Sequence, residues 1–375
     1  MVKKEIVIIG GGASGLMAAG RYANRDIAIL ESNKKIAQKI MISGGGKCNI
    51  TNKKISFKNY LGDNTFISKI LNHYTQHDLL NDLKHDGLVP VLRKESQYFC
   101  PKSASELIDV LYKRCKNIPI FTDHKVLDIQ KKDHFIIQTN RGVFEAKKLI
   151  IASGGLSYPK IGASDIAFKV AQNFGHEVRV LKPALVGLTV QKEQFWMKEL
   201  SGISLLVRLK VDKKEIQGDL LFTHKGISGP AILNTSLYWE KGQIEIDFLP
   251  NKNFDKQFFS SKKNITSSLG LPKRFSKAFL FSIGLQDQPL YKLNHEQKER
   301  LRLLKMYSFA PAGNFGYSKA EVTRGGICTD EIDSETMMSK KCEDLYFLGE
   351  CLDVTGELGG YNFQWAFSTA QRLTL

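Results

Sequence analysis

The feature that most constrains this chain is a glycine loop near its start, Gly10–Gly15, which reads GGGASG. Before the loop, residues 6–9 are all β-branched and apolar, and after it residues 14–23 carry apolar side chains at helical spacing. Residues 26–30 form a second strand-like run. The loop fits the G-x-G-x-x-G pattern in the strand–loop–helix context that gives this pattern its meaning. The sequence therefore predicts a βαβ unit with parallel strands.

Each glycine of the G-x-G-x-x-G pattern has a separate physical role in such a unit. Gly10 permits the tight turn, Gly12 lets the backbone approach a pyrophosphate, and Gly15 lets the helix pack on the strand. The helix N-terminus offers free N–H groups to phosphates. Glu31, 21 residues after Gly10, is expected to accept hydrogen bonds from ribose hydroxyls and to repel a 2′-phosphate. The other expected cofactor contacts of this unit are Ala13, Ser14 and Ser32.

A second motif is the run Ser43–Asn49, which contains three consecutive glycines, Gly44, Gly45 and Gly46. Such a run suits a backbone that lies against a flat or charged ligand. Lys47 can neutralise phosphate, and Lys39 and Asn49 are expected to contact the cofactor as well. Cys48 is either a redox thiol or a small side chain in a tight loop. The second interpretation is favoured because no partner cysteine is close in the sequence.

Two further strands end in small residues, at 149–155 and at 345–350, and a double glycine precedes a helical run at 361–366. Ligands of open α/β sheets bind where parallel strands end. So many junctions suit an extended dinucleotide such as FAD, and the last helix N-terminus can face the charge of a reduced flavin. The expected contacts are Val126, Ala152, Ser153, Gly154, Gly349, Glu350, Asp353, Gly359, Gly360, Tyr361 and Asn362.

The pattern of apolar and polar residues changes at Pro183, and the earlier glycine-rich, β-type pattern returns near Val322. Residues 65–116 are helical in pattern, 186–250 alternate like antiparallel strands, and 251–321 are lysine-rich and helical. We therefore expect an α/β fold with a discontinuous Rossmann-type FAD-binding domain, residues 1–185 and 322–375. Residues 186–321 are expected to form an insert, with a β part at about 186–250 and a helical part at about 251–321.

Composition limits the remaining choices. Six cysteines without a CxxC pair predict neither a disulfide framework nor a metal site. No apolar run is long enough for a membrane span or a signal peptide, so we expect a cytoplasmic protein without membrane association. The net charge of +16 fits either a polyanionic partner or a lysine-rich surface. Because the lysine pairs are scattered, the surface interpretation is favoured over nucleic acid. The oligomeric state is left open.

Several runs resemble one known family. They are the glycine loop with Glu31, KIMISGGGKCNITN at 39–52, FTHKGISGPAIL at 222–233, VTRGGI at 322–327 and LGECLDVTGELGGYNFQWA at 348–366. Together they resemble the BaiN/RdsA family of NAD(P)/FAD-dependent oxidoreductases, also called aminoacetone-oxidase-like. The resemblance implies an FAD domain with an insert made of a β-barrel-like part and a helical part. The chain departs from the family at Ser164-Asp165-Ile166, where the family carries Thr-Gly-Asp-Gly.

The sequence thus predicts an FAD-dependent oxidoreductase with non-covalent FAD. The flavin is expected to be reduced by NAD(P)H and reoxidised by a small organic acceptor or oxygen. The alternative is a flavin-containing nucleic-acid-associated or sensor protein with little turnover. No catalytic acid or base can be assigned. His224 is a candidate proton donor or a residue that holds its loop, and Arg324 is a candidate partner for an anionic substrate or a nicotinamide phosphate.

Overall fold

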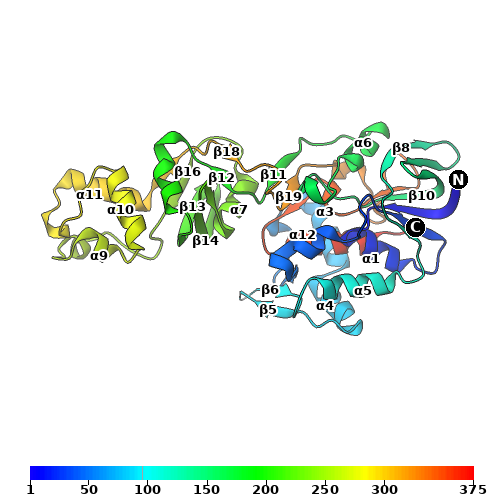
Figure 1. Cartoon of the computed structure of the whole chain (residues 1–375), viewed down its shortest axis with the longest axis horizontal. Helices are drawn as coiled ribbons and strands as arrows, with labels where there is room; N and C mark the ends of the chain where they lie inside the picture. The colour runs from blue at the N-terminus through cyan, green and yellow to red at the C-terminus, as the bar shows by residue number, and fades with distance from the viewer. Residues whose placement is uncertain (95) are drawn as a thin grey trace. The chain divides into compact units, whose positions relative to one another are not determined.

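The computed structural model of this chain describes residues 1–94 and 96–375. These residues form two compact units (Figure 1). Unit 1 comprises Met1–Pro183 and Glu321–Leu375, and unit 2 comprises Ala184–Ala320. The sequence analysis placed the corresponding boundaries at 185/186 and 321/322. Each unit has its own hydrophobic core and is described by itself.

Unit 1 is built on a parallel sheet with strand order β7-β2-β1-β10-β20. The strands are β1 (Val2–Ile9), β2 (Ile27–Leu30), β7 (Ile120–Phe121), β10 (Gly142–Ile151) and β20 (Leu345–Phe347). Their inner residues are apolar and almost fully buried, as expected for strands that are covered on both faces. Ile9 lies beside Leu30 and Ile151, and Ile151 lies beside Phe347, so four strands end at the same level. The predicted α/β class and parallel sheet are confirmed.

The βαβ unit is completed by helix α1, and the first half of β10 carries an antiparallel extension formed by β8 and β9. The further elements of unit 1 are α1 (Ala13–Arg21), α2 (Gln38–Ile42), η1 (Ser43–Gly46), β3 (Asn49–Asn52), η2 (Phe57–Asn59), β4 (Tyr60–Leu61), α3 (Asn64–His73), α4 (Gln76–His85), β5 (Val91–Arg93), β6 (Gln97–Phe99), α5 (Ser105–Arg114), β8 (Val126–Lys131), β9 (Phe135–Thr139), η3 (Pro159–Ile161), α6 (Ile166–Asn173), β11 (Lys182–Ala184), β19 (Val322–Arg324), η7 (Thr329–Glu331), η8 (Gly349–Cys351), β21 (Thr355–Gly356) and α12 (Tyr361–Arg372).

The helical interpretation of residues 65–116 holds for α3, α4 and α5 but is wrong for β5 and β6. These two strands form a hairpin, and β6 also pairs with β3. The partner strand β3 comes from a part of the chain about 45 residues earlier, so the local pattern around Val91–Phe99 does not reveal it. Tertiary pairing decides the state of such short segments.

Unit 2 contains a seven-stranded antiparallel sheet with the order β17-β16-β13-β14-β15-β12-β18. Its strands are β12 (Leu188–Thr189), β13 (Ser204–Val211), β14 (Lys214–Thr223), β15 (Gly226–Ser228), β16 (Ile244–Asp247), β17 (Tyr307–Phe309) and β18 (Gly313–Asn314). Its helices are η4 (Lys192–Leu200), α7 (Pro230–Tyr238), α8 (Lys256–Phe259), α9 (Ile265–Leu269), α10 (Lys273–Ser282), η5 (Leu290–Lys292), α11 (His295–Arg302) and η6 (Leu303–Lys305).

The sheet and the helices of unit 2 share one aromatic core, in which Trp196, Phe222, Phe248 and Phe279 contact one another or common neighbours. Helices α9, α10 and α11 lie together at one end of this unit (Figure 1). Residues 307–309 and 313–314 belong to the sheet, whereas the sequence pattern predicts a helical part as far as about residue 321. Pairing of β17 with β16 and of β18 with β12 overrides the weak local pattern. In the part of the chain that the structure describes, no helix combines the length and apolar content needed to cross a membrane.

Candidate functional site

The glycine loop between β1 and α1 contains two kinds of glycine. Gly10 and Gly15 are required by close packing, whereas Gly12 leaves room for a ligand. Gly10 has φ +108°, and a Cβ there would lie 2.5 Å from the Ala152 carbonyl oxygen. A Cβ at Gly15 would lie 1.9 Å from the Gly10 carbonyl oxygen. A Cβ at Gly12 would meet no atom within 4 Å. The open side of Gly12, at the N-terminus of α1, therefore fits a phosphate cradle.

Glu31 holds this loop from the end of β2. Its side chain is 7% exposed, and its Oε2 accepts a hydrogen bond of 2.9 Å from the Gly11 N–H. Its Oε1 accepts from the backbone and side-chain N–H groups of Asn33, at 2.8 and 2.9 Å. Ser32 also approaches this oxygen, at 3.3 Å. The carboxylate thus joins the glycine loop to the turn after β2, a role beyond the predicted contact with ribose.

Replacement of Glu31 by Ala or Gln is expected to weaken FAD retention. Each charge-assisted hydrogen bond lost to the ribose costs about 1.5–3 kcal/mol. Glu31→Gln keeps the size but leaves one acceptor oxygen, so it cannot accept from both the Gly11 N–H and the Asn33 N–H groups. FAD content after gel filtration and the thermal midpoint of the apo-protein measure the two roles separately. Full FAD retention in both variants would show that Glu31 is not a ribose ligand.

The end of β10 brings a buried serine hydroxyl next to the glycine loop. The Ala152 N–H donates to the Ile9 carbonyl oxygen at 2.8 Å, which places Ser153 directly beside the glycine loop. The Ser153 hydroxyl is buried and has no hydrogen-bond partner among the described residues. A buried hydroxyl without a partner is unfavourable. A polar atom of a bound dinucleotide would satisfy it, so this residue fits the predicted cofactor.

The end of β20 meets the same loop. Gly349 has φ +75°, and a Cβ there would lie 2.9 Å from the Ser14 Oγ atom on α1. The next residue, Glu350, forms an ion pair of 2.6 Å with Lys39. Its other oxygen accepts a 2.9 Å hydrogen bond from the Thr323 N–H. Lys39 and Glu350 were each predicted as cofactor contacts, and the structure pairs them with each other.

Strand β3, just after the triple glycine, meets the double glycine that precedes α12, although about 310 residues separate them. The Asn52 Nδ2 atom donates to the Gly359 carbonyl oxygen at 3.0 Å, and the Thr51 hydroxyl lies 2.6 Å from the Gln364 Oε1 atom. Gly360 has φ +93°, and a Cβ there would lie 2.6 Å from the Thr51 carbonyl carbon and oxygen. Strand β3, which follows the triple glycine, therefore fixes the turn that begins α12.

The first turn of α12 has no side-chain N-cap among the described residues and no acidic residue. Asn362 is turned back on the preceding segment, where it accepts from the Gly356 N–H at 2.8 Å and donates to the Gly356 carbonyl oxygen at 2.9 Å. The ring of Tyr361 packs edge-on against Tyr60. Backbone N–H groups, rather than these side chains, are thus the groups that α12 offers to a ligand.

A tyrosine–carboxyl pair that the sequence did not predict lies close enough to Lys39 for the charge of Lys39 to act on it. The Tyr158 hydroxyl donates to the Glu321 Oε1 atom at 3.1 Å, and Tyr158 has φ +63°. Burial raises the pKa of Glu321, while its bond with Tyr158 and the charge of Lys39 act in the opposite direction. Burial and the Glu321 charge raise the pKa of Tyr158. No local signal joins two residues 163 positions apart.

Comparison with known proteins decides the family. Residues 4–374 match the family described as HI0933-like protein Rossmann domain. The chain belongs to this family. Proteins named ribosomal RNA dihydrouridine synthase, from Haemophilus influenzae and Escherichia coli, are both 35% identical to it; the alignments cover 99% of this chain and 98% and 97% of those proteins. A Clostridium scindens protein named 3-dehydro-bile acid delta(4,6)-reductase is 30% identical, with 97% of each chain covered.

A solved structure extends this result to the fold. The 3-ketosteroid-delta4-(5alpha)-dehydrogenase from Rhodococcus jostii, in complex with 4-androstene-3,17-dione, has a TM-score of 0.51 at 12% identity, over 99% of this chain and 96% of that chain. The resemblance to the BaiN/RdsA family is confirmed. This member of the HI0933-like family is therefore a flavoprotein oxidoreductase with a Rossmann-type domain.

The triple glycine of this family member has a left-handed backbone throughout: φ is +56° at Gly44, +66° at Gly45 and +81° at Gly46. Cβ atoms at the last two would meet nothing within 4 Å, and Lys47 beside them is exposed. This loop is consistent with an open ligand-facing turn. Its contact with the cofactor stays a prediction.

Cys48 is fully buried and lies opposite Cys100, next to the pairing of Asn49 with Phe99 between β3 and β6. The Cys100 N–H donates to the Cys48 carbonyl oxygen at 3.3 Å. Hydrogen bonding with the Cys100 thiol and burial raise the pKa of Cys48. The structure thus supplies the cysteine neighbour that the sequence did not reveal, but a buried thiol with a raised pKa is a poor nucleophile.

The remaining predicted residues lie apart from the glycine loop to different degrees. Val126 begins β8, shortly after His124, whose N–H donates to the Glu31 carbonyl oxygen at 2.9 Å. Burial raises the pKa of Asp353, and the charges of Arg179 and Arg324 oppose that shift. The charge of Arg324 therefore acts on Asp353. His224 is exposed on the turn between β14 and β15 of unit 2.

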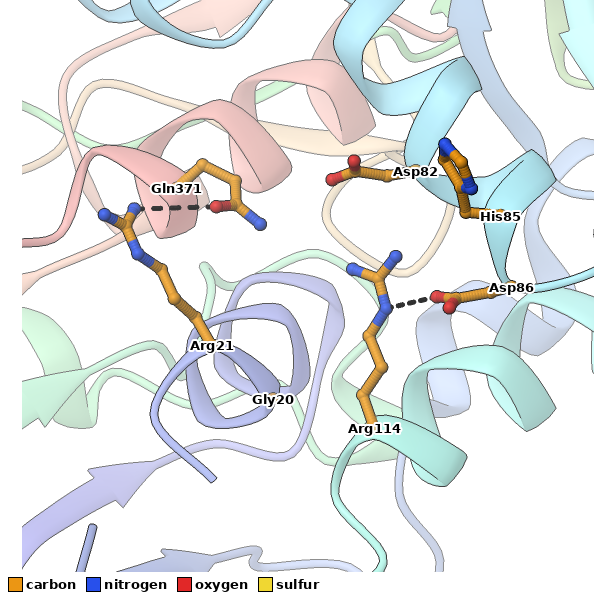
Figure 2. Close-up of a pocket in the computed structure, with 7 residues that line it drawn as sticks. All are labelled: Gly20, Arg21, Asp82, His85, Asp86, Arg114 and Gln371. Carbon is orange, nitrogen blue, oxygen red and sulfur yellow. Dashed lines mark hydrogen bonds and ion pairs between the residues drawn. The ribbon is translucent and has the colours of Figure 1, made fainter. Parts of the chain in front are cut away.

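A cavity of about 420 Å³ in unit 1 is a different place from these junctions. Figure 2 shows Arg114 directed at Asp86 and Arg21 directed at Gln371 within it. It lies at the C-terminal end of α1, whereas the phosphate loop is at the N-terminal end, and no predicted cofactor residue lines it. Arg114 pairs with Asp86, while Asp82 accepts from the Tyr74 hydroxyl and Arg21 donates to Gln371, so we assign no cofactor contact to this cavity.

Proposed function

We propose that this flavoprotein reduces uridine in ribosomal RNA to dihydrouridine, with NAD(P)H as the electron donor. The observation that supports this most is the 35% identity to two proteins of that name over almost the whole of each chain. The net charge of +16 favours a polyanionic substrate. The sequence alone favours a small organic acceptor over nucleic acid, and the names of these two relatives support ribosomal RNA instead. A substrate in the ribosome would place the protein in the cytoplasm.

The reactions that the names of these relatives describe are chemically similar. Uracil carries a C5=C6 double bond conjugated with its C4 carbonyl, and a Δ4,6-reductase of a 3-oxo steroid acts on a double bond conjugated with a carbonyl. For uracil, a hydride adds to C6, the carbon β to the C4 carbonyl, and a proton adds to C5, the α carbon. The Δ4 bond of a 3-oxo steroid is reduced in the same way, with the hydride on C5 and the proton on C4. For uridine the balance is NAD(P)H plus a proton plus uridine, giving NAD(P)⁺ and dihydrouridine.

The residues near the carboxyl ends of the parallel strands fit non-covalent FAD. Gly12 and the N-terminus of α1 would hold the pyrophosphate, Glu31 the ribose, and Ser153 a polar atom of the cofactor. The N–H groups at the start of α12 would face the flavin N1–O2 edge. When bound, FAD supplies the hydride.

Tyr158 and Glu321 are the groups that we assign to the proton. Their hydrogen bond links a half-buried phenol to a carboxyl whose pKa is raised by burial. In the structure the phenol donates to the Glu321 carboxyl. When Glu321 is protonated the bond reverses: the carboxyl O–H donates to the phenol oxygen, and the phenol O–H turns toward the α carbon. The carboxyl proton then replaces the proton that the phenol gives to the α carbon. Such a positioned acid is typical of proton transfer to carbon.

The test uses FAD-loaded protein, NADH or NADPH, and ribosomal RNA from a strain that lacks the corresponding gene, all under anaerobic conditions. We expect the flavin to be reduced and dihydrouridine to be found by mass spectrometry of the digested RNA. A 3-oxo-Δ4 steroid is the matched small-molecule acceptor. Reoxidation by the steroid without any dihydrouridine would favour the second candidate function, a small-molecule enone reductase, which the 30% identity to the bile-acid reductase supports.

We also expect the pure protein to be yellow and to release FAD, not FMN, when it is denatured. The Glu31 carboxylate and the phosphate loop address an adenosine ribose and a pyrophosphate, which FMN lacks. Buried Cys48 is not positioned for attack on a flavin. Mass spectrometry identifies the released chromophore. Colour that stays with acid-precipitated protein would contradict the non-covalent assignment.

A further inference from the structure

The helical part of unit 2 concentrates positive charge. Residues 251–306 contain 12 Lys and Arg against four Asp and Glu, a net charge of +8 and half of the +16 of the whole chain. In contrast, residues 321–375 contain four Lys and Arg against ten Asp and Glu. The basic excess is therefore carried largely by one module rather than by the surface as a whole.

The acids of this module are engaged locally: Glu296 pairs with Arg300, Glu299 with Arg302, Asp287 accepts from Thr266, and Asp255 caps α8. Six exposed lysines of this module are in no ion pair among the described residues, namely Lys256, Lys262, Lys263, Lys273, Lys277 and Lys292, the last of which lies over the Tyr291 ring. No described carboxylate of the module pairs with these lysines, so their charges are available to a partner.

Helix α10 orders part of this charge into a stripe. It buries Phe275 and Phe279 in the aromatic core of unit 2, which turns Lys273 and Lys277 outward. Lys273, Lys277 and Phe281 follow at i, i+4 and i+8, the spacing of one helix face. The helix contains no acidic residue. Two like charges one helical turn apart repel each other in the unbound protein, and a bound polyanion would neutralise this repulsion.

Phe281 ends this stripe with an aromatic ring in solvent. Its side chain is 85% exposed, more than any other large hydrophobic side chain that the structure describes. Phe279, two residues earlier and therefore on the opposite face of the helix, fills the core position, so Phe281 is not needed for packing. An exposed ring beside unpaired lysines is the arrangement with which proteins stack unpaired bases and hold the adjoining phosphates.

From this geometry we propose that the outer face of α10, with Lys273, Lys277 and Phe281, binds a single-stranded segment of ribosomal RNA. The lysines contact phosphates and Phe281 stacks on a base. This inference rests on the proposed function for the identity of the RNA. It assigns substrate capture to unit 2, whereas the redox chemistry belongs to unit 1.

The test compares FAD-loaded wild type with Lys273→Glu/Lys277→Glu and with Phe281→Ala. The charge-matched control is Lys113→Glu/Lys116→Glu, two exposed lysines in and just after α5 of unit 1. Binding of a fluorescent ribosomal RNA fragment is measured between low and moderate salt. We expect the double variant to bind roughly 10- to 100-fold more weakly, with a salt slope smaller by about one per lost phosphate contact. Phe281→Ala should lose roughly 5- to 100-fold, and Phe281→Tyr should restore binding.

The two proposals fail separately. One outcome would overturn only the proposed α10 surface. In it the wild type forms dihydrouridine, and the α10 variants bind RNA with the same affinity and the same salt dependence as the control variant. RNA binding that depends on α10 without dihydrouridine formation would overturn the proposed function and support the surface. Binding to phosphatidylserine vesicles through these residues, with no RNA binding, would overturn the surface in favour of a lipid partner.

Discussion

Gly12→Asp should abolish FAD binding while leaving the apo-protein folded. Gly12 is the N-cap of α1 with φ −90° and ψ −163°, an extended conformation open to any residue. A Cβ there meets no atom, and Asp is a better N-cap than Gly by a few tenths of a kcal/mol. The added carboxylate would occupy the position of the pyrophosphate and repel it. We expect the FAD dissociation constant to rise on the order of 100-fold or more, the equivalent of about two lost charge-assisted hydrogen bonds.

Two matched variants separate bulk, charge and packing. Gly12→Ser adds a neutral N-cap and should lose less FAD affinity than Gly12→Asp. Gly15→Ala places a Cβ 1.9 Å from the Gly10 carbonyl oxygen, so it should lower the thermal midpoint of the apo-protein as well. FAD titration by fluorescence and thermal unfolding without cofactor measure these effects. Wild-type FAD affinity in Gly12→Asp would mean that no pyrophosphate lies at this helix N-terminus.

The parts of the site that the sequence predicts are those with local patterns. The β1–α1–β2 unit follows from apolar periodicity and from the glycines, and Glu31 follows from its place after β2. The loop-holding bonds from Gly11 and Asn33 to Glu31 do not follow from spacing, because they depend on how two turns pack. Local chemistry therefore predicts the cradle but not the network that supports it.

Long-range contacts explain most of what the sequence analysis missed. Tyr158 and Glu321 are joined only by the fold, and each is unremarkable in its own segment. Lys39 and Glu350 were both read as ligand contacts because nothing local shows that they satisfy each other. The lysines were described as scattered pairs, but the period of α10 puts Lys273 and Lys277 on one face.

Tyr158→Phe should nearly stop product formation without changing FAD binding. The hydroxyl is the only group removed, and a positioned acid contributes roughly 10²- to 10⁴-fold to such a step. Reduction of the flavin by NAD(P)H does not use this proton, so its rate should match that of the wild type. Stopped-flow measurement of flavin reduction, followed by assay of dihydrouridine, distinguishes the two half-reactions. An equal loss in both would instead indicate a structural role for this half-buried side chain.

The dependence on pH tests whether Glu321 supplies the proton to Tyr158. Burial raises the pKa of Glu321 above its ordinary value of 4.5, and Tyr158 and Lys39 are the groups that oppose this shift. Since the protonated carboxyl is the donor, product formation should fall as pH rises through this raised pKa. The amide of Glu321→Gln cannot release a proton, but it remains a hydrogen-bond partner for Tyr158. Product formation by this variant should therefore be slow and should not fall as pH rises through the pKa of Glu321. A Glu321→Gln profile that falls at the same pH as the wild type would assign the titration to another group and remove Glu321 from the proton path.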